Sequence, residues 1–251
     1  MSTFTLAKNK GLARSTVIQT CRHNSSINLW ARNAFRLFGI VSGTFTLVVV
    51  PTLKDSGLKT GFGRGTQYLT ILSLCLTIIS LTLGIAGDFL KKQHLLRIKD
   101  AMLPVITPGE CAVGVLYWYL TLSNVYHIYP DGNRYIPFWI DFQMHGLPAL
   151  FVLVEMFYFS KTFQVKRLTD FYAISMFALF YMGWSSLCAH IDGEWPYPIL
   201  QNLDCPWKRL RMMFTSYLIY VALHFIISET HIRSRAAREF KHIIETAKES
   251  L

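Results

Sequence analysis

Six long apolar segments dominate the pattern of hydrophobic and polar positions along this chain of 251 residues. Each segment is close to the length of about 20 residues that a helix needs to cross a bilayer. The third is the weakest, because Pro104, Pro108 and Glu110 interrupt its start, although neighbouring helices can satisfy the carbonyls that a proline frees. The pattern predicts an all-α membrane protein, a bundle of about six transmembrane helices. The segments cover, approximately, residues 33–53, 67–90, 101–123, 136–160, 168–191 and 210–229.

The basic residues beside these segments predict how the bundle is oriented. Of the 25 Lys and Arg, 18 lie on one set of flanks, which includes both ends of the chain, and the other 7 lie on the opposite set. Cytosolic loops carry the excess of Lys and Arg, so we expect both termini to face the cytosol. The expected organisation is a basic arm over 1–32, a six-helix transmembrane domain over 33–229, and an amphipathic helical tail over 230–251.

Composition supports a membrane protein and argues against a nucleic-acid-binding protein. The chain is 52% hydrophobic and 16% charged, whereas soluble domains carry about 25% charge. The formal charge of +10 comes from residues beside apolar segments, where orientation and contact with anionic lipid explain it better than nucleic acid does. The five cysteines are scattered without zinc-type spacing, so neither a disulfide framework nor a metal site is expected.

The fourth apolar segment carries three polar residues that are costly inside a bilayer. Asp141, His145 and Glu155 lie within the run FWIDFQMHGLPALFVLVEMFYF. Each charge near the bilayer centre costs about 2.5–3.5 kcal/mol, so such side chains usually face the bundle interior or a watery cavity. His145 leans back toward Asp141, four residues earlier on the same helical face. The group is either polar glue between helices or part of a functional site.

Catalytic signatures of soluble enzymes are missing from the sequence: it has no G-x-S-x-G, H-E-x-x-H, phosphate-loop or G-x-G-x-x-G motif. The glycines of TGFGRGTQ are interpreted as a flexible loop before the second segment. Thr70, His145 and His190 are instead expected at one depth, toward the non-cytosolic side. A hydroxyl is a weak nucleophile that needs a neighbouring base, and His145 could serve Thr70 if their helices adjoin.

The sequence contains four short runs that carry a resemblance: GFGRGTQYLTILSL, DFQMHGLPALFVLVEM, GEWPYPIL and KDAMLPV. Together they resemble the androgen-induced protein family of membrane threonine hydrolases. GFGRGTQYLTILSL is similar to the segment around that family's nucleophilic threonine, which falls on Thr70. DFQMHGLPALFVLVEM is similar to the segment with its essential histidine, which falls on His145. GEWPYPIL resembles its Trp-x-Tyr-Pro turn, and KDAMLPV resembles its entry to the third helix. The resemblance covers about residues 60–205. Thr66 departs from it, as do the basic arm and the long tail.

This resemblance implies a membrane-embedded lipid ester hydrolase that cleaves fatty acid esters of hydroxy fatty acids. It implies Thr70 as the nucleophile and His145 as the base, without a cofactor or a metal. Our own inference from the i, i+4 spacing adds Asp141 as the residue that orients the imidazole. The substrate is expected within the bilayer, and the oligomeric state stays open. Candidate substrate-binding residues are Arg64, Arg134, His190, Trp195 and Tyr197.

Two other functions and several compartments remain open from the sequence. His145, His190 and His224 could ligate haem in a transmembrane electron carrier. A non-catalytic lipid-binding or scaffold protein would instead use the polar residues of the fourth segment as helix glue. We expect an integral membrane protein of the endoplasmic reticulum, with the mitochondrial and plasma membranes as alternatives. The acid-free basic arm also fits a mitochondrial transit peptide.

Overall fold

The computed structural model describes residues 29–53, 61–129, 132–160 and 163–249. The chain divides into two compact units, residues 1–35 and 36–251, and the description below concerns the second. The part of the basic arm before residue 29 lies outside the described residues. All regular elements of the described ranges are helical. They are α2 Leu29–Val49, η1 Val50–Thr52, η2 Arg64–Gln67, α3 Leu69–Phe89, α4 Gln93–Ser123, η3 Val125–His127, α5 Phe138–His145, α6 Leu147–Val154, η4 Glu155–Phe159, α7 Arg167–Asp192, α8 Pro198–Gln201 and α9 Pro206–Glu249.

Six helical stretches of the described chain are long and apolar enough to cross a membrane, which confirms the predicted fold class. They comprise Leu29–Thr52, Leu69–Phe89, Gln93–Ser123, Phe138–Phe159, Arg167–Asp192 and Pro206–Lys248. Large apolar side chains such as Met176, Leu179 and Phe180 are exposed along α7. Such a face is unfavourable in water but matches the hydrocarbon of a bilayer.

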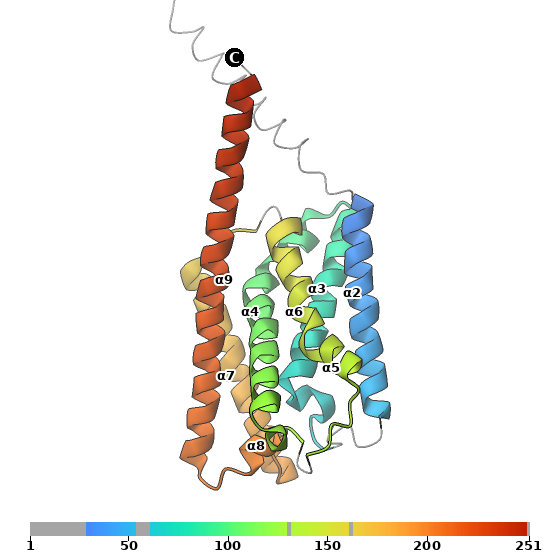
Figure 1. The fold of residues 1–251 in the computed structure, drawn as a ribbon, viewed down its shortest axis with the longest axis vertical. Helices are drawn as coiled ribbons and strands as arrows, with labels where there is room; N and C mark the ends of the chain where they lie inside the picture. The colour runs from blue at the N-terminus through green and yellow to red at the C-terminus, as the bar shows by residue number, and fades with distance from the viewer. Residues whose placement is uncertain (1–28, 54–60, 130–131, 161–162, 250–251) are drawn as a thin grey trace, which may run out of the picture. The chain divides into compact units, whose positions relative to one another are not determined.

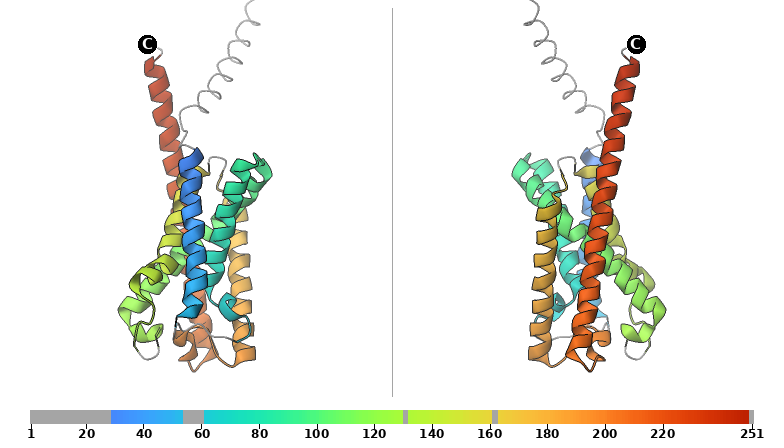
Figure 2. Two further views of the ribbon diagram at one scale, coloured as in Figure 1. Left: turned by 90° about the vertical axis from the view of Figure 1, so that its right-hand side faces the viewer. Right: turned by 90° about the vertical axis from the view of Figure 1, so that its left-hand side faces the viewer.

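Helix α4 is the central element of the bundle. In its most apolar window 61% of the residues are buried, against 17% for α7 and for α9. It packs against α3, α6, α7 and α9, and Figure 2 shows it crossing the bundle obliquely. The helix begins at Gln93, not near residue 101 as the apolar pattern predicted, and it runs through Pro104 and Pro108. The first turns of the helix are polar, so the hydropathy pattern did not include them. Hydropathy indicates which residues lie in lipid and not which residues are helical.

The fourth span is interrupted twice. Helix α5 ends at His145, Gly146 has φ −130° and ψ −50°, and α6 starts with Pro148 in its first turn. A proline has no N–H to donate, so a helix usually bends or breaks there. At its far end the span finishes in a π-helical turn over Glu155–Phe159. Turns of this kind widen the helix and often accompany functional sites.

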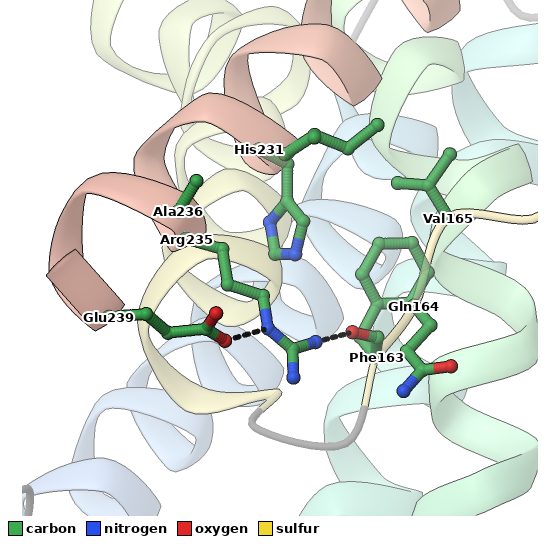
Figure 3. A pocket seen from close by; sticks show the side chains of 8 residues that line it. Phe163, Gln164, Val165, His231, Arg235, Ala236 and Glu239 are labelled. Atoms are coloured by element: carbon green, nitrogen blue, oxygen red, sulfur yellow. Dashed lines mark hydrogen bonds and ion pairs between the residues drawn. The ribbon is translucent and has the colours of Figure 1, made fainter.

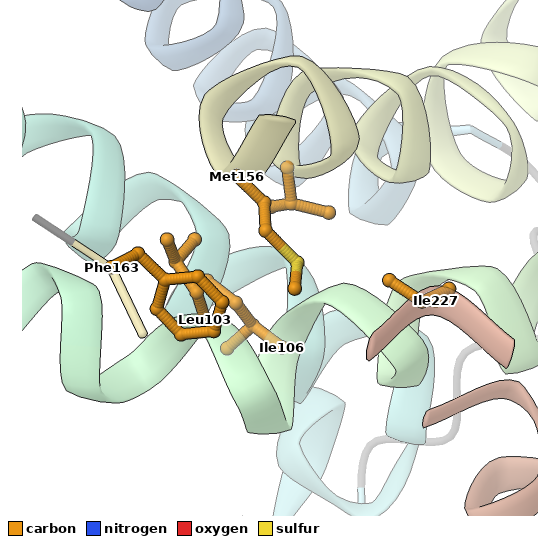
Figure 4. Packing of buried hydrophobic residues seen from close by; sticks show 6 residues of the cluster. Leu103, Ile106, Met156, Phe163 and Ile227 are labelled. Carbon is orange, nitrogen blue, oxygen red and sulfur yellow. The ribbon is translucent and has the colours of Figure 1, made fainter. Parts of the chain in front are cut away.

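An apolar cluster joins α4, the end of the fourth span and α9. Leu103 and Ile106 of α4 contact Met156, Phe163 and Ile227, all of them at most 9% exposed. Figure 4 shows the Met156 side chain pointing from the fourth span toward the α4 side chains. Close packing of this kind, rather than the hydrophobic effect, drives helix association where the alternative neighbour is lipid.

A buried ionic network lies at the end of the bundle where α3 finishes. The Arg36 guanidinium donates from Nε and Nη2 to the two carboxylate oxygens of Glu155, at 2.8 and 2.6 Å, and from Nη1 to Asp88 at 2.6 Å. Lys99 Nζ donates to Glu155 and to Ser160, both at 2.5 Å. Glu155 is fully buried. It is therefore not part of a polar knot with Asp141 and His145, because its partners come from α2 and α4.

The polar tail continues α9 without interruption. One helix runs from Pro206 to Glu249 (Figure 1). Beyond the apolar part, i, i+4 ion pairs join Glu229 to Arg233 at 2.9 Å and Arg235 to Glu239 at 3.2 Å. Pairs of this spacing stabilise exposed helices by about 0.3–0.5 kcal/mol each.

The orientation of the bundle stays a prediction and has a direct test. Asn24-Ser25-Ser26 is a formal glycosylation sequon in the basic arm. If the arm faces the cytosol, as the distribution of Lys and Arg predicts, Asn24 receives no glycan. Expression in cells with a glycosylating endoplasmic reticulum should give one electrophoretic band that glycosidase does not shift. A glycosidase-sensitive band that disappears in Asn24→Gln would reverse the orientation.

Candidate functional site

His145 is held rigidly at the end of α5. Its Nδ1 lies 2.8 Å from Asp141 Oδ1 and 3.2 Å from the Asp141 carbonyl oxygen. Its ring stacks on Tyr117 of α4, with centroids 3.4 Å apart and planes 2° from parallel. The other Asp141 oxygen accepts the Tyr117 hydroxyl at 2.7 Å, and Tyr117 meets the Tyr129 hydroxyl at 3.0 Å. All the hydrogen bonds of His145 within the described chain use Nδ1, so Nε2 is the atom left for chemistry.

Thr70 is buried in the first turn of α3, and two tyrosines surround the start of that helix. The Leu69 N–H, which has no partner within the helix, donates to Tyr181 at 3.1 Å and to Tyr197 at 3.0 Å. The Tyr181 hydroxyl donates in turn to the Gln67 carbonyl at 3.1 Å. The Tyr197 phenol also interacts with the Thr70 hydroxyl. Desolvation raises the pKa of Tyr197, so its hydroxyl stays protonated at neutral pH.

The glycine-rich segment before α3 is docked on α7, which differs from the flexible loop expected from the sequence. Trp184 Nε1 donates to the Thr66 carbonyl at 3.2 Å, and Asp192 accepts the Phe62 N–H at 2.8 Å. Gly63 has φ +80°, and a Cβ there would lie 2.6 Å from the Cys188 sulfur. Glycine is required for both reasons. This docking fixes where α3, and with it Thr70, begins.

Thr70 and His145 lie at a similar depth in the bundle. Helices α3 and α4 are antiparallel, and Thr77 Oγ1 donates to Glu110 at 2.7 Å. Thr70 lies seven residues before Thr77, toward the start of α3. Tyr117 lies seven residues after Glu110, toward the end of α4. Both steps span about 10 Å at 1.5 Å per residue. Tyr117 carries the stacked His145. No hydrogen bond between described residues joins Thr70 to His145, so their catalytic contact remains a prediction.

A line of hydroxyls and one carboxyl continues from Thr70 into the bundle, and sequence reasoning missed it. Ser73 and Thr77 follow Thr70 along one face of α3, and both hydrogen-bond the buried Glu110. Glu110 entered the sequence analysis only as an interruption of the third segment. Its pairing could have been anticipated only by matching polar positions on neighbouring helices. Tyr117 lies in the aromatic run LYWYL, which gave no signal at all.

The remaining predicted site residues are more scattered. Arg64 and Arg134 are both exposed, and Arg134 lies close enough to the Tyr129 phenol to act on it electrostatically. His190 is exposed near the end of α7. Trp195 is engaged in the turn after α7, where the Arg209 guanidinium lies 5.7 Å from its ring centroid. Of the predicted substrate-binding residues, Tyr197 is therefore the one that the fold brings to Thr70.

The histidines considered as haem ligands lie in separate environments. His145 is tied to Asp141, His224 lies 3.5 Å from Ser228 in α9, and His190 is exposed. Within the described ranges, no group of three or more His, Cys, Asp or Glu side chains is arranged to hold a metal ion.

Comparison with known proteins places the chain in a family. The model of the FAR-17a/AIG1-like proteins matches residues 31–231. The chain belongs to the FAR-17a/AIG1-like family. This match contains Thr70, His145 and all the other predicted site residues. The resemblance seen in the short motifs of this FAR-17a/AIG1-like protein is thereby confirmed.

Curated relatives of this FAR-17a/AIG1-like protein are distant but extend over most of the chain. A UPF0641 membrane protein of Schizosaccharomyces pombe is 26% identical over 71% of this chain and 80% of its own length. The androgen-induced gene 1 protein of Homo sapiens is 29% identical over 67% of this chain and 76% of its own. The androgen-dependent TFPI-regulating protein of Mesocricetus auratus is 24% identical over 65% of this chain and 74% of its own length. No solved structure matches the chain significantly.

Gly114 controls how closely α4 approaches His145. A Cβ at position 114 would lie 2.8 Å from the His145 carbonyl oxygen, which is backbone and cannot move aside cheaply. We expect Gly114→Ala to push α5 from α4 and to disturb the Tyr117 stack. Any reaction that uses His145 as a base should then slow at least tenfold per folded molecule, measured on protein that passes size exclusion.

A matched control exists on the same helix. A Cβ at Gly109 would make only an ordinary contact, 3.8 Å from the Tyr220 ring. Gly109→Ala also carries the same gain in helix propensity. It should leave activity near that of the wild type. Equal activity of the two variants would mean that the α4–α5 approach does not position His145 for the reaction.

Proposed function

We propose that this protein is a membrane-embedded lipid ester hydrolase that cleaves fatty acid esters of hydroxy fatty acids. In this proposal Thr70 is the nucleophile and His145 is the general base. The observation that carries the proposal is the Asp141–His145 pair stacked on Tyr117. A buried imidazole with one nitrogen tied to a carboxylate and the other directed elsewhere is the arrangement that general-base catalysis uses. Family membership supports the same residues through their motifs.

Asp141 has the position of the orienting residue in this mechanism. Its two oxygens accept from His145 Nδ1 and from the Tyr117 hydroxyl. This fixes the tautomer with the proton on Nδ1 and leaves the lone pair of Nε2 for a hydroxyl proton. Tyr117 acts on the same ring twice, because it covers one face of the imidazole and also holds the carboxylate. An imidazole fixed in this way loses little entropy when it takes up a proton.

The reaction proceeds in two acyl-transfer steps. As Thr70 Oγ1 attacks the ester carbonyl carbon, its proton passes to His145 Nε2. When the tetrahedral intermediate collapses, His145 returns that proton to the leaving alkoxide, and the hydroxy fatty acid departs as an alcohol. A water then attacks the acyl-threonine carbonyl, again giving its proton to His145. Collapse of this second intermediate releases the fatty acid, and the His145 proton restores the Thr70 hydroxyl.

Tyr197 is the group that we assign to the carbonyl oxygen of the substrate. Its oxygen accepts from the Leu69 N–H at 3.0 Å, which holds the phenol beside Thr70. Its pKa is raised by desolvation, which keeps the hydroxyl hydrogen in place at neutral pH. A protonated phenol beside the nucleophile can donate to the negative oxygen of the tetrahedral intermediate. The positive end of the α3 dipole favours the same charge.

The substrate's position in the bilayer fits the depth of this site. An ester part-way along an acyl chain lies below the head groups, where Thr70 sits in the first turn of α3. The free carboxylate would then reach the interface, where Arg134 or Arg64 could bind it. Arg134 is the better placed of the two, because its charge already acts on Tyr129. We place the protein in the endoplasmic reticulum membrane, with the site in the non-cytosolic half.

Covalent labelling tests the proposal most directly. A fluorophosphonate probe for serine and threonine hydrolases should label the purified wild-type protein. Labelling should disappear in Thr70→Ala, because the nucleophilic oxygen is gone. Ser73→Ala is a matched control, since it removes a hydroxyl one turn further along the same face of α3. Labelling that persists in Thr70→Ala would mean that the nucleophile is another residue, and a wild type that is not labelled would leave a non-catalytic lipid-binding protein as the better interpretation.

A further inference from the structure

A cavity lies at the end of the bundle that is away from Thr70. It has a volume of about 300 Å³ and is formed between α9 and the segment that precedes α7 (Figure 3). One wall is apolar and includes Phe163, Val165, Ile232 and Ala236. His231 and Arg235 supply polar atoms to the same space. The volume is at the lower end of the range for small-molecule sites, about 300–1,000 Å³.

His231 is buried in this cavity without a hydrogen-bond partner. Its side chain is 4% exposed, and neither ring nitrogen has a partner among the described residues. The rings of Phe157 and Phe163 face it edge-on, with centroids 5.3 and 5.1 Å away. Buried polar atoms are satisfied in the great majority of cases, and each unsatisfied one is costly. We therefore expect the imidazole to hydrogen-bond something that enters the cavity.

The charges around His231 favour an anion. Arg235 and Arg238 both act electrostatically on the imidazole. Arg235 is anchored at the cavity by a 3.0 Å bond from Nη1 to the Phe163 carbonyl and a 3.2 Å bond from Nε to Glu239. Its guanidinium has five N–H donors, so these bonds leave donors for a ligand. Glu239 is the acidic residue that lines the cavity, and Arg235 neutralises it.

The level of the cavity matches the edge of the bilayer. The sixth apolar segment covers about residues 210–229, the length of one crossing, so α9 leaves the hydrocarbon near residue 229. The fourth span ends at Phe159, and α7 starts at Arg167. Residues of both cavity walls therefore lie just outside the hydrocarbon, where lipid head groups are. From position 233 onward α9 is rich in Arg and Lys, as in segments that bind anionic lipid.

We propose that this cavity binds the anionic head group of a membrane lipid, a fatty acid carboxylate or a phospholipid phosphate. Arg235 and His231 hold the anionic oxygens, and the first methylenes of the acyl chain lie on the apolar wall. This site is separate from the proposed catalytic one, and the inference does not depend on the hydrolase reaction.

Photocrosslinking of the full-length protein tests this site. The purified chain in neutral maltoside micelles is irradiated with three diazirine lipids of equal chain length: a fatty acid, a phosphatidic acid and a fatty alcohol. We expect crosslinked peptides that contain residues 163–165 or 231–239, at least fivefold more abundant with an anionic head group than with the alcohol. The fatty acid and phosphatidic acid arms show which source of the anion binds.

Two variants and a matched control decide whether the cavity is responsible. Arg235→Gln removes the anchored cation, and Ala236→Phe fills the cavity. Each should lower the anionic crosslinks at least fivefold. Arg233→Gln removes an equivalent charge two residues earlier, where the side chain is 79% exposed, and should change little. Variants are compared after size exclusion, so misfolded protein is not counted. Equal labelling by the alcohol, or crosslinks unchanged in Ala236→Phe, would overturn the proposal.

Discussion

Thr70→Ala should abolish hydrolysis of a fatty acid ester of a hydroxy fatty acid, while Thr70→Ser retains measurable activity. Alanine has no oxygen to form the acyl-enzyme, whereas serine keeps the hydroxyl beside Tyr197. His145→Ala should be as inactive as Thr70→Ala, because without a base the hydroxyl keeps its proton. The measurement is release of free fatty acid from a defined ester, at equal amounts of folded protein in micelles.

The double variant Thr70→Ala/His145→Ala shows whether the two residues act together in one reaction or contribute independently to activity. Residues that act together are strongly non-additive, so Thr70→Ala/His145→Ala should be little worse than either single variant. Ser73→Ala, which alters the same face of α3, serves as the control and should stay active. If Thr70→Ala hydrolyses the ester as fast as the wild type, the proposed mechanism is wrong. A wild type inactive on every lipid ester would reject the proposed function itself.

Arg36→Met should destabilise the bundle by about 3–5 kcal/mol, the cost of removing one partner from a buried ion pair. Arg36 and Glu155 are 1% and 0% exposed, and the guanidinium also holds Asp88. Without it the buried carboxylates of Asp88 and Glu155 each lose a cation that lies at 2.6 Å, and Lys99 remains beside Glu155. The thermal unfolding midpoint in detergent micelles should fall by many degrees. Near-ultraviolet circular dichroism measures this midpoint.

Two controls bracket this stability effect. Arg97→Met removes an exposed arginine from α4 and should change the midpoint little. Arg36→Met/Glu155→Leu removes both charges and should recover part of the loss, because apolar replacements of a whole buried pair are often tolerated. If Arg36→Met has the same unfolding midpoint as the wild type, the network contributes to specificity or function rather than to stability.

Gly84 shows how closely the network depends on shape. A Cβ at this position would lie 2.8 Å from the Arg36 guanidinium carbon. The missing side chain thus creates the space in which the guanidinium reaches both Asp88 and Glu155. The glycine belongs to a long apolar segment, and nothing in the sequence indicates that it accommodates a cation.

The sequence by itself determined the class of this protein and its six spans. Hydropathy along one chain suffices for this, because a bilayer requires each crossing segment to be apolar and to satisfy its own backbone. The pairing of Asp141 with His145 was also predictable, since residues four apart lie on one helical face. The short motifs of Thr70 and His145 indicated the family. Each of these inferences depends on residues that are close together in the sequence, so one chain read in order is enough to make it.

Contacts between helices were decided only by the tertiary structure. Glu155 pairs with Arg36, 119 residues earlier, although the sequence placed it in one group with His145. The stack of Tyr117 on His145 and the approach of Tyr197 to Thr70 join residues from different spans. A periodic pattern shows which face of a helix is polar but not which neighbour that face meets. That choice depends on close packing at positions such as Gly114, where a missing side chain lets two helices touch.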